Sequence, residues 1–77
     1  MNGRHHEAYV RIGLNIMLCR KARGLTQEQL AEKAGYSRQQ IQRVETAVAA
    51  PSVALLLDLS EALQVPLERL LDLRGQL

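Results

Sequence analysis

The sequence predicts an all-α domain, and three observations support this prediction. Two segments between Thr26 and Glu45 carry matching capping residues and are separated by a glycine. Apolar residues on both sides of this stretch recur every three or four positions, which is helical spacing. The 77 residues include no Phe, no Trp and only two Tyr, so the core must be built from aliphatic side chains. We therefore expect a compact bundle of five short helices.

The length of 77 residues predicts a single domain, residues 1–77, with a flexible lead-in at 1–8, a folded core at 9–73 and a loose tail at 74–77. One Cys cannot form an internal disulfide, which favours a reducing compartment. No apolar run approaches the roughly eighteen residues of a membrane span. The first residues also lack the apolar segment of a secretory signal. We expect a cytoplasmic protein without a membrane partner.

The first predicted helix spans residues 9–23 and is ended by Gly24. Its apolar residues form two stripes. One stripe has the spacing of a core-facing surface and consists of Tyr9, Ile12, Ile16 and Cys19. The second stripe lies on another side of the same helix and consists of Val10, Leu14, Met17 and Leu18. A helix that is apolar on two sides needs cover on both, so the second stripe packs either on the C-terminal segment or in a subunit interface.

The next two helices are predicted from their boundaries. Thr26 can cap the first of them and Gln29 completes a capping box. Ser37 and Gln40 repeat this arrangement at the second helix, which we expect over 38–46. Gly35 between them can adopt the left-handed conformation that ends a helix, because it has no Cβ. The sequence therefore specifies two helices joined by a sharp turn.

The helix at 38–46 has one apolar and one polar side. Ile41 and Val44 face inward, together with the small or apolar residues Leu30, Ala31 and Ala34 of the preceding helix. The outward side carries Arg38, Gln39, Gln42 and Arg43. Arg pairs with guanine and Gln with adenine when an exposed helix enters the DNA major groove. A solvated surface helix would also be rich in Arg and Gln, but the two caps and the glycine turn favour a helix-turn-helix unit.

The last two helices are expected to close the core. Ser52 caps the first of them, whose core-facing residues we predict to be Val53, Leu56, Leu57, Leu59, Ala62 and Leu63. Ala54 and Leu55 make this helix more apolar than one buried side requires. Pro66 is suited to the first turn of a final short helix that runs to about Leu73.

Charge is distributed unevenly along the chain. Residues 1–45 contain eight Lys or Arg against four Glu, whereas residues 46–77 contain two Arg against four acidic residues. The first part therefore carries a net charge of +4 and the second −2. This asymmetry is expected when one side of a protein faces a polyanion.

From about Ile12 to Leu71 the chain resembles the lambda-repressor-like helix-turn-helix family, which contains phage repressors, Cro proteins and XRE-type regulators. The matching segments are residues 20–35, 37–45 and 51–65. Within them the residues that fall in register are Gly24, Thr26, Gln27, Leu30, Ala31, Gly35, Ser37, Ile41 and Glu45. The resemblance implies a bacterial or phage protein with double-stranded DNA as its partner, no cofactor and a homodimeric assembly on two half-sites.

The resemblance also implies roles for individual residues. The base-reading positions are Arg38, Gln39 and Arg43, with Gln42 and Ser37 in second rank. The candidate phosphate contacts are Gln27, Lys21, Arg23, Gln40 and Ser52, although capping can occupy Gln40. Arg20 is expected to pair with Glu45 and so tie the first helix to the recognition helix.

The segment after Glu45 departs from this family. Relatives usually have a Gly followed by Lys or Arg residues that contact phosphates, whereas residues 46–51 read Thr-Ala-Val-Ala-Ala-Pro. Each missing phosphate contact weakens DNA binding and its salt dependence. Alternatively, the Ala-Val-Ala-Ala run extends the recognition helix by one turn.

A dimer would need surplus apolar surface. The first candidate is the last helix, with Leu67, Leu70, Leu71 and Leu73, and the second is the stripe of Val10, Leu14, Met17 and Leu18. The alternative is a monomer with exposed leucines.

The sequence thus predicts a sequence-specific DNA-binding regulator, most readily a repressor or autoregulator. An enzyme is not expected, because no His, Asp, Glu, Cys or Ser residues have nucleophile, base or metal spacing. The alternative is a protein-interaction module, such as an antitoxin, whose apolar surfaces bind a toxin or another protein partner.

Overall fold

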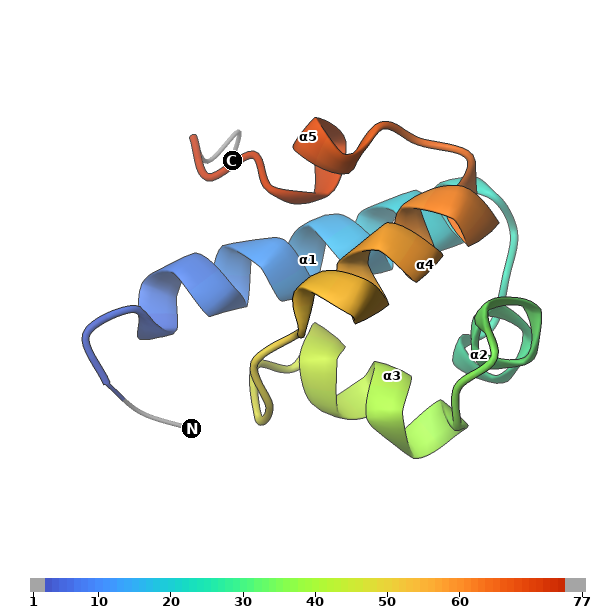
Figure 1. Cartoon of the computed structure of the whole chain (residues 1–77), viewed down its shortest axis with the longest axis horizontal. Coiled ribbons are helices and arrows are strands. Elements are labelled where there is room, and N and C mark those ends of the chain that lie inside the picture. Colours follow the sequence, from blue (N-terminus) through green and yellow to red (C-terminus); the bar gives the residue numbers. More distant parts are fainter. Residues whose placement is uncertain (1–2, 75–77) are drawn as a thin grey trace.

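The computed structural model describes residues 3–74, and these residues form five helices. They are α1 (His6–Ala22), α2 (Gln27–Ala34), α3 (Arg38–Glu45), α4 (Val53–Leu63) and α5 (Leu67–Leu70). This confirms the predicted all-α bundle. Figure 1 shows α4 in front of α1, with α3 on one side of α1 and α5 on the opposite side. Within residues 3–74, no helix combines the length and the apolar character needed to cross a membrane.

The helix ends are set by local signals. Both predicted capping boxes are present: Thr26 and Ser37 each accept a hydrogen bond from the backbone N–H three residues later, and the Gln at that position bonds back to the cap. Gly24 and Gly35 adopt left-handed conformations after α1 and α2. The turn between α2 and α3 is therefore determined by residues within it.

The segment after α3 ends the helix instead of extending it. The N–H of Val48 donates to the carbonyl of Arg43 (2.8 Å), and the N–H of Ala47 donates to that of Val44 (3.2 Å). These two bonds form a Schellman motif, with Ala47 at the left-handed position (φ 61°) that glycine usually occupies. The alternative that the Ala-Val-Ala-Ala run extends the helix is wrong, because α3 ends at Glu45, one residue before the predicted end at residue 46. The Ala47 side chain is buried.

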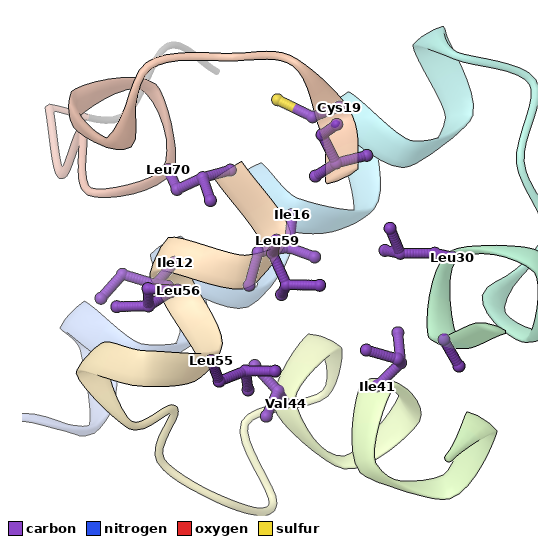
Figure 2. Packing of buried hydrophobic residues seen from close by; sticks show 12 residues of the cluster. Ile12, Ile16, Cys19, Leu30, Ile41, Val44, Leu55, Leu56, Leu59 and Leu70 are labelled. Carbon is purple, nitrogen blue, oxygen red and sulfur yellow. The ribbon is translucent and has the colours of Figure 1, made fainter. Parts of the chain in front are cut away.

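The core is aliphatic and draws on all five helices (Figure 2). The first predicted stripe of α1 is confirmed, because Ile12, Ile16 and Cys19 are buried and Tyr9 packs against them. The other buried apolar residues of this cluster are Leu30, Ala31, Ile41, Val44, Leu55, Leu56, Leu59, Leu63 and Leu70. Hydrophobic burial across these contacts holds the helix-turn-helix unit against α1 and α4.

The expected inner face of α4 was wrong in part. Val53 and Leu57 are 70% and 52% exposed, whereas Leu55 is buried with Leu56. The helix is apolar on nearly every side, so the spacing of its apolar residues does not identify one face. Its neighbours decide the rotation, and they leave Val53 and Leu57 at the surface.

The ends of the chain also differ from expectation. The lead-in is shorter than 1–8, because α1 already begins at His6, and α5 ends at Leu70 and not near Leu73. Arg74 is held by Asp72, while residues 75–77 of the predicted tail lie outside the described residues.

Leu70 is fully buried, so it belongs to the core and cannot form a subunit interface. The buried side chain of Asn15 explains why Leu70 lies against α1. The Asn15 amide donates to the backbone carbonyls of Leu70 (3.0 Å) and Asp72 (2.8 Å). These bonds fasten the C-terminal segment to α1.

Gly13 permits α1 and α3 to approach closely. A Cβ at this position would lie 2.5 Å from the carbonyl oxygen of Val44 and 2.6 Å from that of Glu45. Both contacts are with backbone atoms, which cannot move without shifting the end of α3. A glycine is therefore needed here for packing, within an otherwise regular helix.

We predict that Gly13→Ala lowers the free energy of unfolding by about 1–3 kcal/mol, since the added methyl overpacks the α1–α3 contact. Helix propensity alone predicts the opposite sign, a gain of about 1 kcal/mol. Urea denaturation of the two proteins distinguishes these outcomes, and a more stable variant would contradict the close approach.

Candidate nucleic-acid interface

The outer face of α3 carries a group of long polar side chains. Arg38, Gln39 and Arg43 are exposed, and Gln42 is half-buried beside them. On the opposite side of the helix Ile41 and Val44 are buried. Arg38 and Gln42 are four residues apart, as are Gln39 and Arg43, so the two pairs form adjacent rows along the outer side of the helix. The structure thus brings four of the five predicted base-reading residues together on one surface.

The remaining residues near this face are engaged in capping. Ser37 Oγ accepts from the N–H of Gln40, and Gln40 Oε1 accepts from the N–H of Ser37. Thr46 Oγ1 donates to the carbonyl of Gln42 at the other end of the helix. The side chains of the four outer residues have no hydrogen-bond partner within residues 3–74, so their donors and acceptors are available to a ligand.

A buried network fixes the C-terminal end of α3. Arg20 Nε donates to Glu45 Oε2 at 2.7 Å, and Arg20 Nη2 donates to Glu45 Oε1 at 3.0 Å. The side chains are only 9% and 2% exposed. A third donor, Arg20 Nη1, bonds to the carbonyl of Leu25 at 2.8 Å. The expected ion pair is therefore present as a bidentate contact, which fixes both direction and distance.

Gln27 extends this network to α2. Its Nε2 donates to Glu45 Oε1 at 3.0 Å. Sequence reasoning placed Gln27 at a phosphate without foreseeing this bond. The contact fixes the orientation of the amide at the first residue of α2, where backbone N–H groups are also free.

Two other predicted phosphate contacts have partners within the protein. Arg23 Nη2 donates to the carbonyl of Gln64 at 3.0 Å, at the C-terminal end of α4. Ser52 Oγ accepts from the N–H of Leu55 and caps α4, as expected. Lys21 is exposed near the end of α1. Lys21 is therefore the cationic side chain of this group that is most available to a polyanion.

A hydrogen bond absent from the sequence prediction anchors the turn before α3. The hydroxyl of Tyr36 donates to Asp58 Oδ2 on α4. This bond and the nearby negative charge raise the pKa of the Tyr36 phenol. Because Tyr36 directly precedes the cap of α3, the bond ties the start of that helix to α4. This bond joins residues that are distant in sequence, so local spacing carries no signal for it.

Local spacing also carries no signal for the hydrogen bonds of Asn15, whose polar side chain is buried. Gly13 did leave a signal, because a glycine within a helix costs stability unless close packing requires it. Among residues 3–74, no three His, Cys, Asp or Glu side chains are grouped so that they could hold a metal ion.

The fold and the α2–α3 pair define a helix-turn-helix domain. Residues 16–70 match the model of the helix-turn-helix family, and the chain therefore belongs to that family. A protein of Methanocaldococcus jannaschii, named as an HTH-type transcriptional regulatory protein, is 46% identical over 54 residues. These cover 70% of this chain but 17% of that protein, so the chain spans less than a fifth of the relative's length.

Solved structures of similar proteins share the architecture. The restriction-modification controller protein C.AhdI from Aeromonas hydrophila is 31% identical with a TM-score of 0.84, over 88% of this chain and 99% of that one. A transcription factor from Neisseria, NHTF, described as hypothetical, is 25% identical with a TM-score of 0.81, over 88% and 76% of the two chains. The P22 c2 repressor, solved with a synthetic operator, is 33% identical with a TM-score of 0.74, over 79% and 92%.

The buried pair generates a stability prediction. Arg20→Ala leaves the Glu45 carboxylate buried without its charge partner, and we expect a loss of about 3–5 kcal/mol in the free energy of unfolding. Arg23→Ala is the matched control, because it removes an exposed guanidinium and should cost less than about 1 kcal/mol. Thermal and urea denaturation measure both. Equal losses would contradict the structural role of the pair.

Proposed function

We propose that the chain is a cytoplasmic, sequence-specific DNA-binding regulator of transcription that acts as a repressor or autoregulator. The observation that carries this proposal is the outer face of α3, where four long polar side chains lack partners on a helix anchored at both ends. Membership of the helix-turn-helix family and similarity to a repressor solved with operator DNA support it. The family and fold are those of regulators, and the proposal includes no catalytic role or cofactor.

In this proposal α3 reads base edges in the major groove. Arg38 and Gln39 lie in its first turn and Arg43 one turn further on. Residues five apart are separated by about 7.5 Å along a helix, which is close to two base-pair steps of roughly 3.4 Å each. Arg38 and Arg43 can therefore donate to guanines at different positions, with Gln39 pairing with an adenine. Gln42 and Ser37 remain second-rank contacts.

Phosphate contacts would position the helix. The start of α2 supplies backbone N–H groups and the Gln27 amide, which Glu45 holds in place while one amide hydrogen stays free. Lys21 and the Nε2 of Gln40 are further donors, and the N-terminal end of α4 at Ser52 adds backbone N–H groups. Arg23 uses one of its five N–H donors on the carbonyl of Gln64, and the others can join these contacts.

The segment 46–51 contributes little to binding in this proposal. It contains no Lys or Arg, and its conformation is fixed by bonds to α3. Since each phosphate contact contributes about one unit to the salt dependence, we expect a shallow salt slope for each chain. Base contacts would then supply a larger share of the specificity.

A DNA-binding experiment tests the proposal. An operator is selected from random duplexes, and its affinity is measured for the protein and for Arg38→Ala and Arg43→Ala. We expect each variant to lose about 1–3 kcal/mol on that operator and to discriminate less at one base pair. Lys21→Ala should weaken all duplexes equally. Indifference to every duplex offered would reject the regulator and favour the protein-interaction module.

We further propose that the protein acts as a homodimer through α4. Val53 and Leu57 are exposed four residues apart on the side of α4 that faces away from the core. Figure 1 shows α4 in front of α1 and α3 below them. A vertical two-fold axis in front of α4 would therefore leave both α3 helices facing downward.

The surfaces proposed from the sequence fit a dimer less well. Leu70 is buried, and the exposed Leu71 and Leu73 follow α5 on the opposite side of α1 from α3. A two-fold contact there would point the two α3 helices in opposite directions. Leu14 and Met17 of the α1 stripe are half-buried, while Val10 and Leu18 are exposed.

Leu57→Glu tests the α4 interface, because it places a charge in an apolar contact. We expect this variant to stay folded and to become monomeric in analytical ultracentrifugation. Leu71→Glu is the matched control on the opposite side and should keep the oligomeric state. If Leu71→Glu becomes monomeric and Leu57→Glu does not, the interface lies on the C-terminal segment. If both variants remain dimers, neither surface forms the interface.

A further inference from the structure

A groove of about 410 Å³ lies between α1 on one side and α5 with the segment that follows it on the other. Its lining combines apolar and charged side chains: Arg11, Leu14, Asn15, Leu18, Arg69, Asp72 and Arg74. Asn15 is committed to the backbone bonds that hold the C-terminal segment in place. Both walls of the groove are therefore fixed, one by the helix and the other by these bonds.

The charges in the groove do not balance. Arg74 donates to both carboxylate oxygens of Asp72, at 2.9 and 3.0 Å. These hydrogen bonds lower the pKa of Asp72 to about 2, so the carboxylate stays ionised. Its negative charge is paired with the guanidinium of Arg74. Arg69 lies near enough to Asp72 to contribute to this lowered pKa, but neither Arg69 nor Arg11 has an acidic partner within salt-bridge distance among residues 3–74. The groove therefore presents a net charge of about +2 to a ligand.

Apolar surface accompanies this charge. Leu18 is 46% exposed, and Leu14 is half-buried one turn before it. The two leucines are four residues apart on α1 and so lie on one face, with Arg11 a further turn towards the N-terminus. An occupant must cover this leucine surface and also bring negative charge to the arginines on both sides.

The groove is separate from the proposed DNA surface. Figure 1 shows α5 and the segment after it on the opposite side of α1 from α3. One straight duplex against α3 cannot also reach this groove. A second nucleic acid would satisfy Arg11 and Arg69 but would leave the two leucines exposed to water.

From this combination we propose that the groove binds an acidic amphipathic helix of a second protein. Leucine-like residues four apart on that helix would pack on Leu14 and Leu18, and flanking Glu or Asp residues would pair with Arg11 and Arg69. The stretch from Arg11 to Leu18 extends about 10 Å, which matches roughly two turns of a partner helix. This contact leaves α3 free, so the chain can hold DNA and a protein partner together.

The experiment uses a synthetic helical peptide of about 15 residues with Leu on one face and Glu on the others. NMR chemical shifts of the full chain are followed as this peptide is added. We expect shifts centred on Arg11, Leu14, Leu18 and Arg69. A scrambled peptide of the same composition should bind at least about tenfold more weakly, because it cannot present charge and leucine together.

Variants separate this site from general attraction to charge. Arg69→Glu and Leu18→Ser should each weaken peptide binding about tenfold. Lys33→Glu makes the same charge change on α2, outside the groove, and should leave peptide binding unchanged. Arg69→Glu should also leave operator affinity unchanged, so failure here is distinguishable from failure of the DNA proposal.

Four results would overturn the inference. The first is no binding of the amphipathic peptide, and the second is equal binding of the scrambled one. The third is equal weakening by Arg69→Glu and Lys33→Glu, which would indicate a diffuse charge effect. The fourth is displacement of the peptide by a short random duplex that also changes the chemical shifts of the groove residues. This result would assign the site to nucleic acid instead.

Discussion

The buried ion pair between Arg20 and Glu45 is the constraint on which the presentation of α3 depends. The helix has only eight residues, and only Ile41 and Val44 give it apolar anchorage in the core. Such a short helix is marginal alone in water. The bidentate pair, joined by the Gln27 amide, ties its C-terminal end to both α1 and α2. The bidentate geometry makes the contact directional. Because the pair is buried, the loss of either charge would leave the other unpaired away from water.

This pair works only because the backbones of α1 and α3 approach closely. Gly13 provides the space, and the Schellman turn at Ala47 ends α3 immediately after the contact. At the other end the Ser37 capping box and the Tyr36 hydrogen bond to Asp58 define where α3 begins. The helix is thus fixed at both ends by polar contacts and in the middle by aliphatic packing. Its outer side chains remain unpartnered on a rigid support, which is the arrangement that recognition of a ligand requires.

Fixing α3 in this way leaves distinct surfaces for distinct tasks. The outer face of α3 is polar, the exposed side of α4 is apolar, and the groove between α1 and the C-terminal segment combines leucines with arginines. Each surface has a chemistry that suits a different partner: a duplex, a second copy, and an acidic helix. The α3 face and the groove lie on opposite sides of α1, so occupation of one does not obstruct the other.

The sequence by itself determined the helix class, both capping boxes, the turn at Gly35 and the polar face of α3, because these depend on residues a few positions apart. The Arg20–Glu45 contact was accessible through family resemblance alone. Tertiary structure decided which side of α4 is buried: a helix apolar on nearly all sides has no preferred face until neighbours pack against it. It also decided the bonds of Asn15, Gln27 and Tyr36, and the burial of Leu70. These contacts join residues far apart in the chain, and local spacing carries no information about them.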